Sequence, residues 1–220
     1  NNARRPAFAL ARRMREIEPF QVMALLARAK ALEGEGRDIV HMEIGEPDFA
    51  TPQPVCVAGA KALEQGELFY TPALGIPALR EAVARFYKTR YGVTLDPSRV
   101  VITTGSSGAL LLVMAALVNP GDEVLMADPG YPCNRNFVRM MGGVADEIAV
   151  GADTDYQLTP ELVAARWNRN TRAVMVASPS NPTGAFVGRR DREALREFAL
   201  RHDLALICDE VFLDYPAEGV

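Results

Sequence analysis

Short apolar runs alternate with longer helical patterns from residue 99 onward, and this alternation limits the fold more than any other feature of the chain. The apolar runs are rich in β-branched and aliphatic side chains, and they predict strands at 99–103, 123–127, 144–150, 173–177 and 204–208. The segments between them have helical spacing and predict helices at 107–118, 134–141, 160–167 and 189–202. Such alternation implies crossover connections, and strands that are apolar throughout fit burial on both faces. We therefore predict an α/β fold, with a mostly parallel sheet in a three-layer αβα arrangement.

The part of the chain before residue 99 is less regular. Helical spacing predicts helices at 20–33, 52–66 and 76–91. A short apolar run predicts one further strand, at 38–42.

Composition narrows the classes of function. With 49% hydrophobic and 24% charged residues among 220, the chain has ordinary globular composition. A net charge of −4 gives no electrostatic reason to expect nucleic acid, and no apolar run reaches the roughly 18 residues that would predict a membrane span. Cys56, Cys133 and Cys208 are scattered, which favours a reducing, cytoplasmic location. His41 and His202 belong to no pattern with metal-ligand spacing.

Polar and small residues follow several of the predicted strands directly. In open parallel sheets, ligands bind at the carboxyl ends of the strands, so these residues are the candidates for a site. They are GSSG at 105–108, DPGY at 128–131, SPSN at 178–181 and DE at 209–210.

The first of these segments allows two interpretations. Gly105, Ser106 and Ser107 join a strand to a helix, so their backbone either holds a phosphate at the helix N-terminus or simply makes a tight turn. The segment matches neither GxGxxG nor a phosphate loop with Gly-Lys-Ser/Thr.

The remaining candidates are also ambiguous when taken singly. Asp209 directly follows an apolar strand, where a carboxylate is costly unless a cationic ring nitrogen, a helix end or an arginine pairs with it. Asn181 is either a turn residue or an amide that faces a ligand, and Tyr131 either packs in the core or offers a flat face. Together they would suit a flat, phosphorylated heteroaromatic cofactor with a protonated ring nitrogen. Pyridoxal 5'-phosphate (PLP) meets this description, because its protonated ring accepts electrons from a substrate carbanion.

Six motifs occur in an order that is jointly specific. They are GEPDF (45–49), FYTPALGIPALREAVA (69–84), TTGSSGAL (103–110), PGDEVLMADPGYP (120–132), SPSNPTG (178–184) and CDEVF (208–212). In this order they resemble the class I and II aminotransferases, which are PLP-dependent enzymes of the aspartate aminotransferase fold. The resemblance covers the chain from about residue 15 to its end.

The resemblance implies a role for each strand-end residue. The backbone around Gly105, Ser106 and Ser107 would hold the cofactor phosphate, and Tyr131 would stack on the pyridine ring. Asn181 would hydrogen-bond the 3′-oxygen of the ring. Asp209 would pair with the ring nitrogen.

It also implies roles for residues early in the chain and a division into domains. Gly45 would lie near the substrate carboxylate, and Tyr70 would reach the cofactor phosphate of the partner subunit in a homodimer. Residues 1–48 would form an N-terminal arm and the start of a small domain. Residues 49–220 would form the N-terminal part of a large PLP-binding domain whose C-terminal half is absent.

The chain departs from the family pattern in two respects. Phe212 stands where the family commonly has a tyrosine whose hydroxyl also contacts the 3′-oxygen; Tyr215 would not replace it, because three residues along a strand point to the opposite face. The lysine that binds the cofactor in this family would lie beyond Val220, and Lys30, Lys61 and Lys88 match no such position. We therefore assign no catalytic residue within the chain.

The expected activity of the intact parent protein is transfer of an amino group from an α-amino acid to a 2-oxo acid. Two alternatives stay open: a PLP-dependent β-lyase of the same fold, and a non-catalytic aminotransferase-like domain that binds an effector. On either enzymatic interpretation, the 220-residue chain alone is expected to be inactive.

Overall fold

The computed structural model describes residues 9–45, 49–66 and 68–215. By their contacts these residues divide into two units, which we describe separately. One unit is Phe20–Thr103; the other starts at Thr104 and includes the N-terminal segment that ends at Pro19. In the part of the chain that is described, no helix combines the length and the apolar character needed to cross a membrane.

The unit that starts at Thr104 contains a four-stranded sheet in the order β2-β1-β3-β4. All of its strand pairs are parallel, which confirms the predicted sheet. The strands are β1 (Glu123–Asp128), β2 (Val144–Ala149), β3 (Thr171–Ala177) and β4 (Ala205–Asp209).

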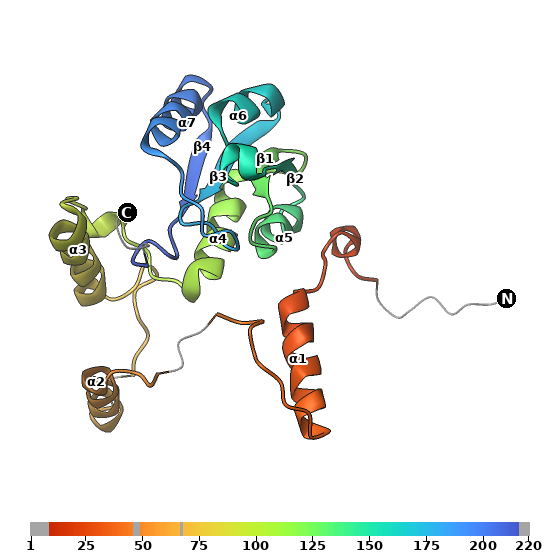
Figure 1. Ribbon diagram of the computed structural model, residues 1–220. Coiled ribbons are helices and arrows are strands. Elements are labelled where there is room, and N and C mark those ends of the chain that lie inside the picture. Colours follow the sequence, from red (N-terminus) through yellow and green to blue (C-terminus); the bar gives the residue numbers. More distant parts are fainter. Residues whose placement is uncertain (1–8, 46–48, 67, 216–220) are drawn as a thin grey trace. The chain divides into compact units, whose positions relative to one another are not determined.

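Helices cover both faces of this sheet (Figure 1), as the three-layer prediction requires. Alternate side chains of β1 divide between two cores, because successive residues of a strand point to opposite faces. Leu125 packs in the core with α6 and α7, whereas Val124 and Met126 pack in the core with α4 and α5. These helices are α4 (Gly105–Leu117), α5 (Cys133–Met140), α6 (Pro160–Arg166) and α7 (Arg189–Arg201).

The other unit contains the three helices predicted there. They are α1 (Gln21–Gly34), α2 (Gln53–Glu64) and α3 (Pro77–Tyr91). α3 starts with Pro77 and ends at Tyr91, and the Gly92 that follows has a φ of 71°, the left-handed conformation that favours glycine at a helix end. Short 3₁₀ helices complete the described elements: η1 (Arg12–Arg15), η2 (Pro97–Arg99) and η3 (Ala152–Thr154).

Two predicted strands are absent from the described residues. Neither 38–42 nor 99–103 is a strand. A strand needs a neighbour to complete its ladder of hydrogen bonds, and neither range has one among the described strands. Within 99–103, the Ile102 N–H instead donates to Leu74 O in an irregular segment, at 3.1 Å. An apolar run in the sequence predicts a strand, but it does not show whether a neighbouring strand is there to pair with it.

Truncating a buried side chain of α7 should destabilise the sheet unit. Leu195 is 2% exposed in the core with β3, whereas Leu200 on the same helix is 67% exposed. We expect Leu195→Ala to lower the free energy of unfolding by about 2–5 kcal/mol, and Leu200→Ala by about 0.5 kcal/mol or less. Urea unfolding of the complete polypeptide, followed by circular dichroism, measures both. Equal losses would contradict the assigned face of α7.

Candidate cofactor-binding site

The carboxyl ends of β3 and β4 lie side by side. Ala177, the last residue of β3, pairs with Asp209, the last residue of β4. The next amide along, Ser178 N–H, donates to Asp209 O at 3.0 Å. The loop that carries Asn181 therefore leaves the sheet directly beside the Asp209 backbone. β1 lies on the other side of β3, so its own end loop, with Tyr131, belongs to the same edge.

Asp209 presents a negative charge without a basic partner at this edge. Its Oδ1 accepts a hydrogen bond from Val211 N–H at 3.1 Å. None of the ion pairs between described residues includes it. The expectation of a fully buried strand is wrong for β4, which is half-exposed because it is an outer strand of the described sheet.

Tyr131 lies close to both Ser107 and Asp209. Its pKa is raised, first because the phenol is partly buried and next because of a hydrogen bond with the Cys133 side chain. The negative charge of Asp209 also raises this pKa, whereas a hydrogen bond with the Ser107 side chain lowers it. These opposing influences on one hydroxyl show that the structure brings three of the predicted site residues together.

The N-terminus of α4 is suited to an anion. The helix starts at Gly105, two residues earlier than predicted, so the glycine and the two serines that follow form its first turn. Gly105 has φ 72°, in the left-handed region that favours glycine, and a Cβ built there would meet no atom within 4 Å. The Thr104 side chain makes no capping hydrogen bond, and the first turn has no acidic residue. Amides at such a helix end attract phosphate.

The loop that carries Asn181 is held by its own backbone. Ser180 N–H donates to Ala185 O at 2.9 Å, and Gly184 N–H donates to Ser180 O at 2.8 Å. Val187 N–H donates to the Ser178 hydroxyl oxygen at 3.0 Å. The turn-rich sequence of this loop thus folds into a compact turn, with Asn181 half-buried at its tip.

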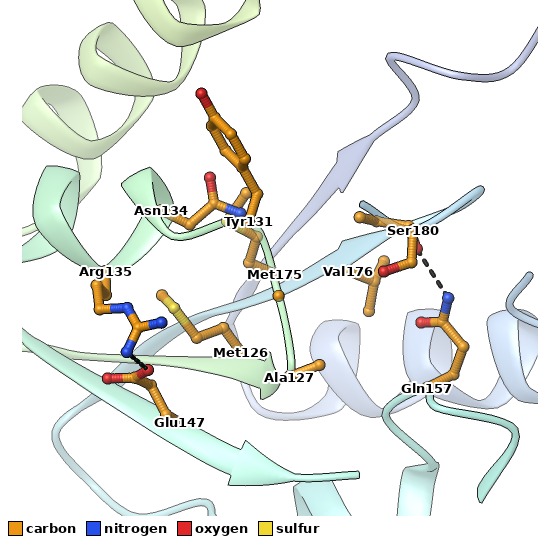
Figure 2. A pocket seen from close by; sticks show the side chains of 12 residues that line it. Met126, Ala127, Tyr131, Asn134, Arg135, Glu147, Gln157, Met175, Val176 and Ser180 are labelled. Carbon is orange, nitrogen blue, oxygen red and sulfur yellow. Dashed lines mark hydrogen bonds and ion pairs between the residues drawn. The ribbon is translucent and has the colours of Figure 1, made fainter. Parts of the chain in front are cut away.

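A small cavity of about 20 Å³ lies beneath this edge of the sheet. Tyr131 and Asn134 line one side of it, and Gln157 and Ser180 line the other (Figure 2). Asn134 is 7% exposed, and its Oδ1 has no hydrogen-bond partner among the described residues.

The charged residues of the same cavity are paired with one another. Glu147 on β2 contacts Arg135 at 2.6 Å and Arg139 at 3.1 Å, both from α5; the Arg135 contact is drawn in Figure 2. Glu147 is neutralised in this way, whereas Asp209 pairs with no basic side chain among the described residues.

Sequence reasoning missed two buried polar residues of the site. Asn134 could have been found, since it shares a helical face with Val138, an apolar residue one turn later, and a polar residue at such a position is unusual. Gln157 could not, because it follows two loop residues and nothing in its neighbourhood marks it as buried.

Two predicted site residues lie in the other unit. Gly45 and Tyr70 are both exposed there. Their approach to the substrate and to a partner's cofactor stays a prediction. Residues 46–48 of the GEPDF motif lie outside the described residues. The predicted domain boundary at residue 48 also stays a prediction.

The argument that placed Tyr215 on the opposite face from Phe212 is wrong. β4 ends at Asp209, and the chain then turns, with Leu213 N–H donating to Glu210 O at 2.9 Å. Strand alternation therefore does not apply to these residues. The two rings stand edge to face with their centroids 6.4 Å apart.

Comparison with known proteins identifies the family. The family model described as aminotransferase class I and II matches residues 37–218. The chain belongs to the class I and II aminotransferases. This aminotransferase family is PLP-dependent, which agrees with the charge and shape of the strand edge.

Similar proteins include aminotransferases with different stated substrates. The chain is 39% identical over 210 residues to the (5-formylfuran-3-yl)methyl phosphate transaminase of Methanocaldococcus jannaschii, covering 96% of this chain and 54% of that protein. It is 41% identical over 196 residues to the valine–pyruvate aminotransferase of Mycobacterium tuberculosis, with coverages of 89% and 50%. It superimposes with a TM-score of 0.91 and 39% identity on the crystal structure of an aminotransferase from Mycobacterium tuberculosis, covering 97% of this chain and 55% of that chain. The chain spans about half the length of these relatives, and the α/β fold prediction is confirmed.

Tyr131 should lose its proton at a higher pH than an ordinary tyrosine. Since its pKa is raised above 10.0 in the folded protein, the resulting stabilisation is fully present below pH 10 and is lost as the pH rises through the folded pKa. An ultraviolet difference titration between wild type and Tyr131→Phe, on the complete polypeptide without cofactor, measures the midpoint. Ser107→Ala should raise this midpoint further, and Ser106→Ala should not change it. A midpoint at or below 10, or a fall with Ser107→Ala, would refute the assigned contacts.

Proposed function

We propose that the complete polypeptide is a PLP-dependent aminotransferase that transfers an amino group from an α-amino acid to a 2-oxo acid. The observation that carries this proposal is the Asp209 carboxylate, which pairs with no basic side chain of the described residues and lies near Tyr131 and the N-terminus of α4. The half-length match to aminotransferases supports it.

The residues at the strand edge fit PLP in charge and in shape. A helix N-terminus carries partial positive charge, and Asp209 carries negative charge. PLP has the complementary pattern, with a phosphate at one end and a protonated ring nitrogen at the other. Tyr131 stands between the two groups with a flat, half-buried ring.

Each residue then has a distinct task. The amides of Gly105, Ser106 and Ser107 bind the phosphate, and Tyr131 stacks on the ring. The Asn181 amide donates to the 3′-oxygen, while Asp209 keeps the ring nitrogen protonated through an ion pair. When bound, PLP supplies an electron sink for the substrate carbanion.

The proposal extends to the substrate, the partner and the location. In the complete protein, Gly45 would lie near the substrate carboxylate, and Tyr70 would reach the cofactor phosphate of a partner subunit in a homodimer. One relative is named for valine and pyruvate and the other for a formylfuran phosphate, so the proposal names no individual amino acid or oxo acid. A cytoplasmic location agrees with the cysteines, all of which are free thiols: Cys56, Cys133 and Cys208.

Replacing Asp209 should weaken PLP binding, because the protonated ring nitrogen loses its counter-charge. We expect Asp209→Asn to raise the Kd for PLP about 10- to 100-fold in the complete polypeptide, as loss of a close charge pair typically does. Absorbance titration with PLP measures this. Asp203→Asn is a matched control, since Asp203 is an exposed carboxylate just before the other end of β4, with a φ of 54° that asparagine tolerates.

The products formed from an amino acid distinguish the proposed aminotransferase from a β-lyase of the same fold. With an amino acid alone, the wild-type protein should release one equivalent of 2-oxo acid per bound cofactor. Continuous release of pyruvate and ammonia would instead indicate a lyase. Equal PLP affinity in wild type and Asp209→Asn, or no PLP binding by the wild type, would refute the proposal.

A further inference from the structure

Gln157 is a buried polar residue that reaches the Asn181 loop from a different part of the chain. It is 6% exposed and lies between η3 and α6. The two residues before it, Asp155 and Tyr156, both have left-handed backbone conformations, with φ of 50° and 54°. The chain reverses there, and the Gln157 side chain enters the cavity beneath the strand edge (Figure 2).

The Gln157 carboxamide donates two hydrogen bonds. Its Nε2 lies 2.9 Å from Ala177 O and 2.7 Å from Ala185 O. Ala177 ends β3, and Ala185 follows directly after Gly184, so the two carbonyls stand at the two ends of the loop that carries Asn181. One amide group therefore bridges both ends of this loop.

The bridge also supports the internal turn of the loop. Ala185 O accepts a second hydrogen bond, from Ser180 N–H, so it joins the Gln157 bridge to the loop's own backbone. A buried carbonyl that loses its donor carries the full cost of desolvation. Without Gln157, Ala185 O keeps its bond from Ser180 N–H, but Ala177 O loses the Gln157 donor and the two ends of the loop lose their shared link.

We propose that Gln157 is a positioning residue that sets the direction of the Asn181 side chain toward the cofactor. This inference rests on the proposed function, because it takes PLP as the ligand of Asn181. This role requires a side chain at position 157 that donates two hydrogen bonds, since both bridged atoms are carbonyl oxygens. A side chain of similar size without N–H groups fills the space but does not bridge the loop.

The test compares Gln157→Leu with a control that weakens the fold nearby. Thr159→Ala removes the N-cap of α6, whose hydroxyl oxygen accepts from Leu162 N–H at 3.3 Å, and it leaves the loop untouched. Both variants should lower the melting temperature of the complete polypeptide. Gln157→Leu alone should raise the Kd for PLP, by about tenfold, the effect of one lost hydrogen bond. It alone should also speed amide hydrogen exchange in the peptide that covers 178–187.

A double-mutant cycle shows whether Gln157 acts through Asn181. If it does, Gln157→Leu should weaken PLP binding much less in an Asn181→Ala background than in the wild type. Gln157→Glu gives a conservative rescue, because a protonated carboxyl donates one of the two hydrogen bonds. Its PLP affinity relative to Gln157→Leu should therefore improve as the pH falls.

The outcomes separate this inference from the proposed function. Unchanged exchange in the loop of Gln157→Leu, or an equal loss of PLP affinity in the Asn181→Ala background, overturns the positioning role. A wild-type protein without affinity for PLP overturns the proposed function instead, and loop exchange then still decides whether Gln157 holds the loop.

Discussion

The proposed site depends on one electrostatic condition: the half-buried Asp209 carboxylate at the end of β4 pairs with no basic side chain in the described part of the chain. A partly desolvated charge costs folding free energy unless a counter-charge offsets it. Nearby Glu147, by contrast, is offset by ion pairs with two arginines of α5. In the proposed function, the protonated ring nitrogen of PLP would supply this counter-charge to Asp209.

The sheet places the loops that follow β1, β3 and β4 at the same edge as the Asp209 carboxylate. Parallel pairing aligns the carboxyl ends of β1, β3 and β4, and each end releases a loop with a different chemical group. Tyr131 comes from the first loop and Asn181 from the second, while the N-terminus of α4 supplies positive potential.

Periodicity predicted the elements of the sheet unit within a few residues, because packing there follows the local pattern of apolar side chains. It failed at 38–42 and 99–103, where strand formation depends on a neighbour that no local pattern reveals. The residues that follow strands, such as Tyr131 and Asn181, could be nominated from position alone. Gln157 could not, because its burial results from a reversal of the chain at two left-handed residues and from carbonyls 20 and 28 positions away.

The alternation of side chains along β4 makes the site intolerant of changes in chain length. Opposite Ala177, a slip of β4 by one position would put Cys208 or Glu210 in place of Asp209, and every side chain of the strand would change faces. The proposed site would then have a thiol, or the longer side chain of a glutamate, at the position of Asp209. Insertion or deletion of one residue within β4, ahead of Asp209, would impose this slip or a bulge, although it alters no residue of the proposed site.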